Sequence, residues 1–194
     1  SIALVGYYED GAHFGDASPV TLSSEQYDDA FVARYSAAGE FLWVRDAGGQ
    51  GIDQALGVAA TADGGVVVTG QFQQDLVFGR GTPEELTLLS AGSSDFFLAR
   101  FDAAGALKWA KRGGGKDETP GFGEVGNDVV ELADGALLVT GEFEGPSTFG
   151  EGEPQETTLG TPDDWSSRKM FLVRYSATGE LEWARATGTG SGDG

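Results

Sequence analysis

One sequence pattern occurs three times in this chain, and it restricts the fold more than any single residue does. The copies occupy residues 31–43, 97–109 and 171–183. Each contains an aromatic residue, an arginine three positions later, a second aromatic residue, a turn that ends in glycine, and a tryptophan. Repeats of about 65–75 residues are supersecondary units that bury their apolar faces only against neighbouring units. The pattern therefore predicts a repeat architecture.

A second motif, Val-Thr-Gly-x-Phe, occurs at residues 68–72 and 139–143, with a degenerate copy at residues 4–8. Each copy is followed by a Phe-Gly pair, and the pairs begin at Phe14, Phe78 and Phe149. The β-branched and apolar residues in and before this motif are typical of a strand that is buried on both faces.

Each repeat is predicted to contain four short strands, which we call A, B, C and D from the inner to the outer strand. In the second repeat they are expected at residues 56–61, 66–72, 96–101 and 106–111. The A–B and C–D connections are tight turns that contain glycine. No segment shows the 3.6-residue period of a helix. A row of four-stranded antiparallel units predicts an all-β fold made of β-propeller blades.

The register of the repeats predicts a single β-propeller segment over residues 1–194, with repeats of approximately 1–54, 55–127 and 128–194. Residue 1 aligns with residue 65, so the first of the three blades is expected to lack its inner strand. Its strand B, from Ile2 to Tyr8, would then have an open edge without the Lys or Pro that protect exposed edges. Two alternatives follow: the chain is part of a larger propeller, or copies self-associate through this edge.

The combined pattern of these motifs resembles the SBBP-type bacterial β-propeller repeat over nearly the whole chain. The residues that carry the resemblance are the aromatic-Val-Ala-Arg-Tyr segment at 31–35, the glycine turn, the tryptophan, the following Gly-Gly pair, and Val-Val-Thr-Gly at 67–70. The resemblance implies blades, and a module of a large bacterial surface or secreted protein. It therefore implies an extracellular or cell-surface location, and it supplies no catalytic residue.

Composition limits the classes of partner. The net charge of −19, from 12 basic and 31 acidic residues, disfavours nucleic acid, because phosphate binding needs clustered Lys and Arg. The chain has no cysteine, which removes disulfides and thiol catalysis. No apolar run reaches the roughly 18 residues of a membrane span. The repeated tryptophans Trp43, Trp109 and Trp183 are predicted to pack in the core, since every repeat has one.

Most of the acidic residues fall in the B–C loops (9–29, 74–94 and 145–168) and the D–A loops, which a meander places on one rim. Loops on a rigid scaffold commonly carry binding sites. The sequence therefore predicts a non-catalytic binding or structural module, with a protein or carbohydrate ligand on this rim. Two alternatives remain: acidic loops that are merely solvated, and a glycan-acting hydrolase or lyase that uses the rim carboxylates.

The predicted ligand-binding residues are Trp165, Asp163 and Asp164. Trp165 has no counterpart in the other repeats and lies in the longest B–C loop, beside the two aspartates. An unrepeated aromatic side chain on a variable loop suits a sugar or peptide. No catalytic residue is predicted, because the sole histidine, His13, lies in a loop without a nucleophile motif.

The many carboxylates raise the possibility of a calcium site. The candidate ligands are Asp16, the Asp28-Asp29 pair and the Asp163-Asp164 pair, but no Asp-x-Asp-x-Asp-Gly loop occurs. No cofactor or metal is therefore predicted, with calcium as the alternative. Three further aspartates are expected to precede strand A and to cap its turn, namely Asp53, Asp128 and Asp193.

Overall fold

The computed structural model describes residues 1–16, 18–24, 27–116, 123–161 and 168–187, and in these ranges the chain forms seventeen β-strands. No helix in the described residues is long and apolar enough to cross a membrane. The strands are β1 (Ile2–Tyr8), β2 (Gly11–Phe14), β3 (Val20–Ser23), β4 (Asp29–Tyr35), β5 (Phe41–Gly48), β6 (Gln54–Ala60), β7 (Val66–Phe72), β8 (Asp75–Phe78), β9 (Leu86–Leu89), β10 (Asp95–Phe101), β11 (Leu107–Gly114), β12 (Val125–Glu131), β13 (Leu137–Phe143), β14 (Ser147–Phe149), β15 (Thr157–Leu159), β16 (Lys169–Tyr175) and β17 (Leu181–Thr187).

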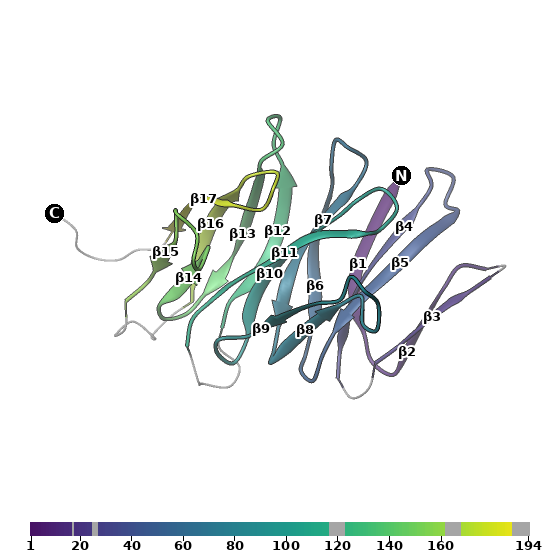
Figure 1. Ribbon diagram of the computed structural model, residues 1–194, viewed down its shortest axis with the longest axis horizontal. Coiled ribbons are helices and arrows are strands. Elements are labelled where there is room, and N and C mark those ends of the chain that lie inside the picture. Colours follow the sequence, from purple (N-terminus) through teal and green to yellow (C-terminus); the bar gives the residue numbers. More distant parts are fainter. Residues whose placement is uncertain (17, 25–26, 117–122, 162–167, 188–194) are drawn as a thin grey trace.

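Eleven of these strands form three antiparallel blades, which stand side by side in Figure 1. The first blade contains β1, β4 and β5, the second contains β6, β7, β10 and β11, and the third contains β12, β13, β16 and β17. The predicted all-β fold of propeller blades is confirmed. Among the described residues β1 pairs only with β4, so the first blade lacks an inner strand, as its register predicts.

The B–C connections differ from the expected loops, because each one contains a β-hairpin. These hairpins are β2–β3, β8–β9 and β14–β15. Two of them extend the sheet of the preceding blade: β8 pairs with the outer strand β5, and β14 pairs with the outer strand β11. The second and third repeats therefore each add a hairpin to the sheet of the preceding blade, which joins successive blades by backbone hydrogen bonds as well as by packing.

The phenylalanine of each Phe-Gly pair anchors its hairpin to the blade from which it comes. The ring centroids of Phe149 and Phe171 are 4.9 Å apart, and those of Phe14 and Phe31 are 5.0 Å apart. The equivalent distance from Phe78 to Phe97 is 6.3 Å. Such pairs stabilise a fold beyond their buried area. Each hairpin thus packs on its own blade, and the backbones of the second and third hairpins also pair with the preceding blade.

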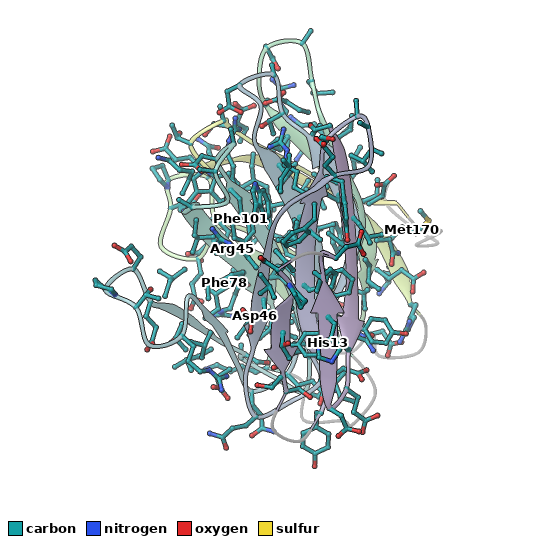
Figure 2. All side chains as sticks on the ribbon, turned by 90° about the vertical axis from the view of Figure 1, so that its right-hand side faces the viewer. His13, Arg45, Asp46, Phe78, Phe101 and Met170 are labelled. Carbon is teal, nitrogen blue, oxygen red and sulfur yellow. The ribbon has the colours of Figure 1, made fainter. Side chains whose placement is uncertain are left out.

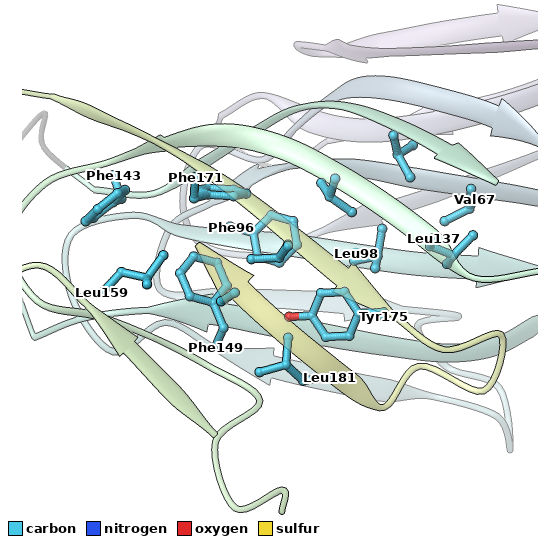
Figure 3. Close-up of a cluster of buried hydrophobic side chains, with 14 residues drawn as sticks. Val67, Phe96, Leu98, Leu137, Phe143, Phe149, Leu159, Phe171, Tyr175 and Leu181 are labelled. Carbon is cyan, nitrogen blue, oxygen red and sulfur yellow. The ribbon is translucent and has the colours of Figure 1, made fainter. Parts of the chain in front are cut away.

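The apolar core lies between the blades. One cluster fills the junction of the first and second blades, and another fills the junction of the second and third. Figure 3 shows the latter, in which Phe149 lies among Phe96, Phe171 and Leu181. Phe96 belongs to β10 of the second blade, whereas Phe171 belongs to β16 of the third. Burial of such rings contributes about 1.5–3 kcal/mol each, so packing between blades is a main source of stability.

The repeated tryptophans join each blade to the next. The indole of Trp43 covers Gly105 in the C–D turn of the second blade, and its Nε1–H donates to the Ala103 carbonyl at 3.1 Å. Trp109 covers Gly179 of the third blade in the same way, with a 3.3 Å hydrogen bond to the Ala177 carbonyl. The expectation that these residues pack in the core is met by Trp43, which is 8% exposed, whereas Trp109 and Trp183 are half-buried.

A pair of glycine variants measures this contact. Gly179 and Gly39 both have a left-handed backbone, with φ of +83° and +84°, but a Cβ at Gly179 would lie 2.8 Å from the Trp109 ring, whereas a Cβ at Gly39 would meet no atom within 4 Å. We expect Gly39→Ala to cost only the backbone strain of about 1–2 kcal/mol. Gly179→Ala should cost about 1–3 kcal/mol more, because the ring must move. Urea unfolding of both variants tests this, and equal losses would contradict the tryptophan contact.

Candidate functional site

Two equivalent hollows lie along the outer edge of the blades, each between successive hairpins. The first hollow has a volume of about 360 Å³ and the second about 340 Å³. The residues that line the first are Thr21, Leu22, Ser23, Asp29, Asp46, Gly48, Val77 and Arg80. The second is lined by Thr87, Leu88, Leu89, Ala110, Lys111, Arg112, Gly150, Glu151, Glu153 and Tyr175. Because β3 corresponds to β9 and β8 to β14, the hollow is a feature that recurs with the blades.

The two hollows carry opposite charges at equivalent positions. In the second hollow Arg112 of the outer strand forms ion pairs with Glu151 of the hairpin and, at 2.8 Å, with the buried Asp95. In the first hollow the position of Arg112 is taken by Asp46, and that of Glu151 by Arg80. Asp29 is the counterpart of Asp95, at the start of β4. The first hollow therefore places two carboxylates where the second has an acid paired with a base.

The charges of the second hollow hold its hairpin in place. Lys111 Nζ lies 2.6 Å from Oε1 of Glu153, and the other oxygen of Glu153 accepts the backbone N–H of Leu181 at 2.6 Å. Burial raises the pKa of Tyr175 above its ordinary value, and the charge of Glu153 adds to this effect. The basic side chains of this hollow are thus engaged by acids of the same molecule.

The first hollow combines its two acids with one arginine. Asp29 is buried, Asp46 is exposed, and Arg80 donates to the Gly48 carbonyl at 2.7 Å. Burial raises the pKa of Tyr8, and the charges of Asp46 and Asp29 raise it further, so the phenol stays protonated at neutral pH. Figure 2 looks onto the first blade and labels Asp46 and His13.

The buried carboxylate of Asp53 lies in the connection between the first and second blades. Oδ1 of Asp53 accepts the backbone N–H of Gln73 at 3.3 Å, and Oδ2 has no hydrogen-bond partner in the described residues. Burial raises the pKa of Asp53 to about 8, and the charges of Asp29 and Asp75 contribute to the rise. Asp53 is therefore mostly protonated at neutral pH.

The expected equivalence of Asp53 and Asp128 is wrong. Asp128 lies inside β12, at the β-bulge beside Gly126, and its side chain is exposed. The residue that directly precedes β12 is Glu124, which is fully buried and accepts a hydrogen bond from Ser147. Sequence spacing failed here because the connection before β12 is longer than the connection before β6. Asp193 lies outside the described residues.

The predicted ligand-binding residues Trp165, Asp163 and Asp164 also lie outside the described residues, so their placement stays a prediction. Asp28 accepts a hydrogen bond from the Gln54 side chain at 2.8 Å. In the described ranges no group of three or more His, Asp or Glu side chains is arranged to hold a metal ion. His13 lies on β2 rather than in an irregular loop, and its Nδ1 is 2.9 Å from the Thr21 hydroxyl.

The acids of the B–C connections do not all lie on one rim. Each hairpin carries its turn back along the outer edge toward the opposite rim. Glu153, in the β14–β15 turn, contacts Leu181 at the start of β17. Glu84, in the β8–β9 turn, lines a hollow with Gly105 and Leu107, next to the C–D turn of the second blade. The expected concentration of acids on a single rim is wrong for these residues, because it treated the hairpins as loops.

Sequence reasoning missed the residues that define the two hollows. The detectable signal was the position after each Phe-Gly pair, which holds Asp16, Arg80 and Glu151 in the three repeats. A second signal was the position three residues after the repeated tryptophan, which holds Asp46 and Arg112. The charges at the two positions change together between repeats, as expected for side chains that face each other.

Comparison with known proteins adds one relative. No protein-family model matches the chain. Over 132 residues, or 66% of its length, the chain is 25% identical to an uncharacterized WD repeat-containing protein of Acanthamoeba polyphaga mimivirus. The matched region is 9% of the viral protein, so the chain spans only a small part of the length of that relative. Together with three blades of antiparallel strands, this similarity identifies the chain as a β-propeller-like repeat protein.

Proposed function

We propose that this chain is a non-catalytic binding module, and that its first hollow binds a positively charged segment of a protein ligand. The observation that carries the proposal is Asp46, an exposed acid that lines the first hollow at the position of the ion-paired Arg112 in the next repeat. The scaffold is the same in both repeats, so an acid at this position is not required by the fold. An exposed carboxylate in a hollow attracts a guanidinium or ammonium group.

Binding of basic peptides tests this proposal. Calorimetric titration with arginine-rich, neutral and acidic peptides should show binding of the arginine-rich peptide alone. The affinity should fall as the salt concentration rises. Asp46→Asn should weaken binding about fivefold to tenfold, for a loss of roughly 1 kcal/mol. The matched control Glu84→Gln removes the same charge from an exposed side chain outside the hollow. Equal losses in both variants would show a nonspecific charge effect and refute the site.

We further propose a cellular location for the protein and a second ligand-binding segment. The repeat motifs support an SBBP-type module of a bacterial exported or surface protein, with carbohydrate as an alternative ligand at Trp165, Asp163 and Asp164. A glycan array probed with the chain and with Trp165→Ala tests that segment. Unchanged binding in the variant refutes it. Release of reducing ends from a bound polysaccharide, abolished by Asp46→Asn, would instead support the glycan-acting enzyme.

A further inference from the structure

The two ends of the row of blades carry complementary surfaces. We call the head face the outer side of the first blade, which includes the β4–β5 turn (residues 36–40) and strand β2. We call the tail face the outer side of the third blade, which includes Trp183, Arg185 and strand β17. The two blade junctions inside the chain show what each surface accepts, because every junction is built from one tail-type and one head-type surface.

The junction of the first and second blades is the template. Trp43 covers Gly105, and the Arg45 guanidinium lies 5.6 Å from the centroid of the Trp43 ring. Arg45 also donates from Nε to the Gly105 carbonyl at 2.9 Å, and from Nη2 to the Ala104 carbonyl at 3.2 Å. A tryptophan and an arginine of one blade thus grip the C–D turn of the next.

The tail face presents the same grip. Trp183 and Arg185 occupy the positions of Trp43 and Arg45, and the Arg185 guanidinium lies 5.9 Å from the Trp183 ring centroid. The guanidinium donates to the preceding carbonyl, that of Ala184, at 2.7 Å, just as Arg45 donates to Val44 at 2.7 Å. The grip is therefore already formed before any partner arrives, which lowers the entropy that binding must overcome.

The head face presents the turn that such a grip needs. Gly39 has the same left-handed backbone as Gly105, with φ of +84° and +80°, yet it is exposed, and a Cβ there would meet no atom within 4 Å. The same blade also exposes apolar side chains of β1: Ile2, opposite Tyr35, is 53% exposed, and Leu4, opposite Ala33, is 48% exposed. The head face thus shows an unoccupied copy of the surface that Trp43 covers elsewhere.

The backbone edges are complementary as well. Phe78 of β8 pairs with Ala47, and Phe149 of β14 pairs with Gly113. In the described residues, β2 pairs only with β3 and β17 only with β16. Phe14 is the equivalent of Phe78, and Thr187, four residues after its tryptophan, is the equivalent of Ala47. An edge of this kind is a template for another strand.

We propose that the head face of one copy of this chain binds the tail face of a second copy. Trp183 of the second copy lies on Gly39 of the first, and Arg185 donates to the carbonyls of Ala38 and Gly39. Strand β2 adds to strand β17 with Phe14 opposite Thr187. The two surfaces are different, so the contact is heterologous, and it builds closed rings, of which two copies with six blades would be one, or open chains.

Sedimentation velocity on singly blocked variants tests the proposal. Gly39→Asn fills the space over the turn with a residue that tolerates a left-handed backbone, and Arg185→Glu reverses an exposed charge on the tail. Gly81→Asn is the matched control, because Gly81 is exposed, has φ of +75° and has no atom within 4 Å of its Cβ position. Trp183→Ala is a second tail variant, and circular dichroism checks that each protein folds.

The wild type and Gly81→Asn should gain mass with concentration, by about twofold or more. Gly39→Asn and Arg185→Glu should each stay monomeric alone. Mixed in equal amounts, they should form a one-to-one dimer and nothing larger, since one head and one tail remain intact. A wild type that is monomeric throughout would overturn the proposal, as would a blocked variant that still associates alone. A mixture that stays monomeric would overturn it too.

Discussion

Replacing Phe149 by alanine should lower the free energy of unfolding by about 3–5 kcal/mol. Phe149 is fully buried, and its ring lies 4.9 Å from Phe171 of the third blade and 5.9 Å from Phe96 of the second. It also sits on Gly113, where a Cβ would lie 2.7 Å from its ring. The substitution leaves a cavity where two blades and a hairpin meet.

Chemical denaturation of three variants isolates this effect. Phe149→Leu keeps most of the volume and should lose less than half as much as Phe149→Ala. Leu89→Ala, on the hairpin strand β9, removes a side chain that is 65% exposed and should change stability by no more than about 0.5 kcal/mol. If Phe149→Ala costs no more than Leu89→Ala, the hairpin does not pack between the blades.

Replacing Asp53 by asparagine should remove a loss of stability that builds up as the pH rises from about 4 to about 8. The pKa of Asp53 is raised by burial from 3.8 to about 8. Between these values the unfolded chain has released the proton while the folded chain keeps it, so the free energy of unfolding falls as pH rises. At about 1.4 kcal/mol per pKa unit, the shift corresponds to a loss of roughly 6 kcal/mol by pH 9. Asparagine cannot ionise, so the variant does not show this pH-dependent loss of stability.

Thermal melts of the wild type and Asp53→Asn at matched pH values measure the difference. The two proteins should be similar near pH 4, and the variant should become steadily more stable than the wild type up to about pH 8. Asp63→Asn is the contrasting control: hydrogen bonds from Thr61, Gly65 and Arg100 lower the pKa of Asp63 to about 2. The stabilisation that the Asp63 carboxylate gives the wild type is therefore lost only in acid, as the pH falls toward about 2. Parallel pH profiles for the wild type and Asp53→Asn would contradict a raised pKa.

The blades could be predicted from the sequence because their signals are local and repeated. The tight glycine turns, the apolar B strands and the tryptophans each recur at matching positions, and the structure pairs β7 with β10 and β13 with β16 as expected. The missing inner strand of the first blade followed from register alone. Repetition turned weak single signals into a firm fold assignment.

The hairpins could not be predicted in the same way. Their strands are only three or four residues long, and β8 and β14 pair with a strand of another repeat, so local alternation gives little warning. The acids were therefore assigned to loops on one rim, although Glu151 and Glu153 pair with Arg112 and Lys111 on the outer strand. Ion pairs across repeats depend on tertiary placement, which composition does not reveal.

In the structure the second and third repeats each pair a hairpin strand with the outer strand of the preceding blade, and nuclear Overhauser contacts between backbone protons test this most directly. In the isotopically labelled chain, Gly113 and Gly114 should show cross-strand contacts to Phe149 and Thr148, and Ala47 and Gly48 should show them to Phe78 and Val77. Cross-strand contacts confined to partners within the hairpins, with none to β5 or β11, would contradict the account.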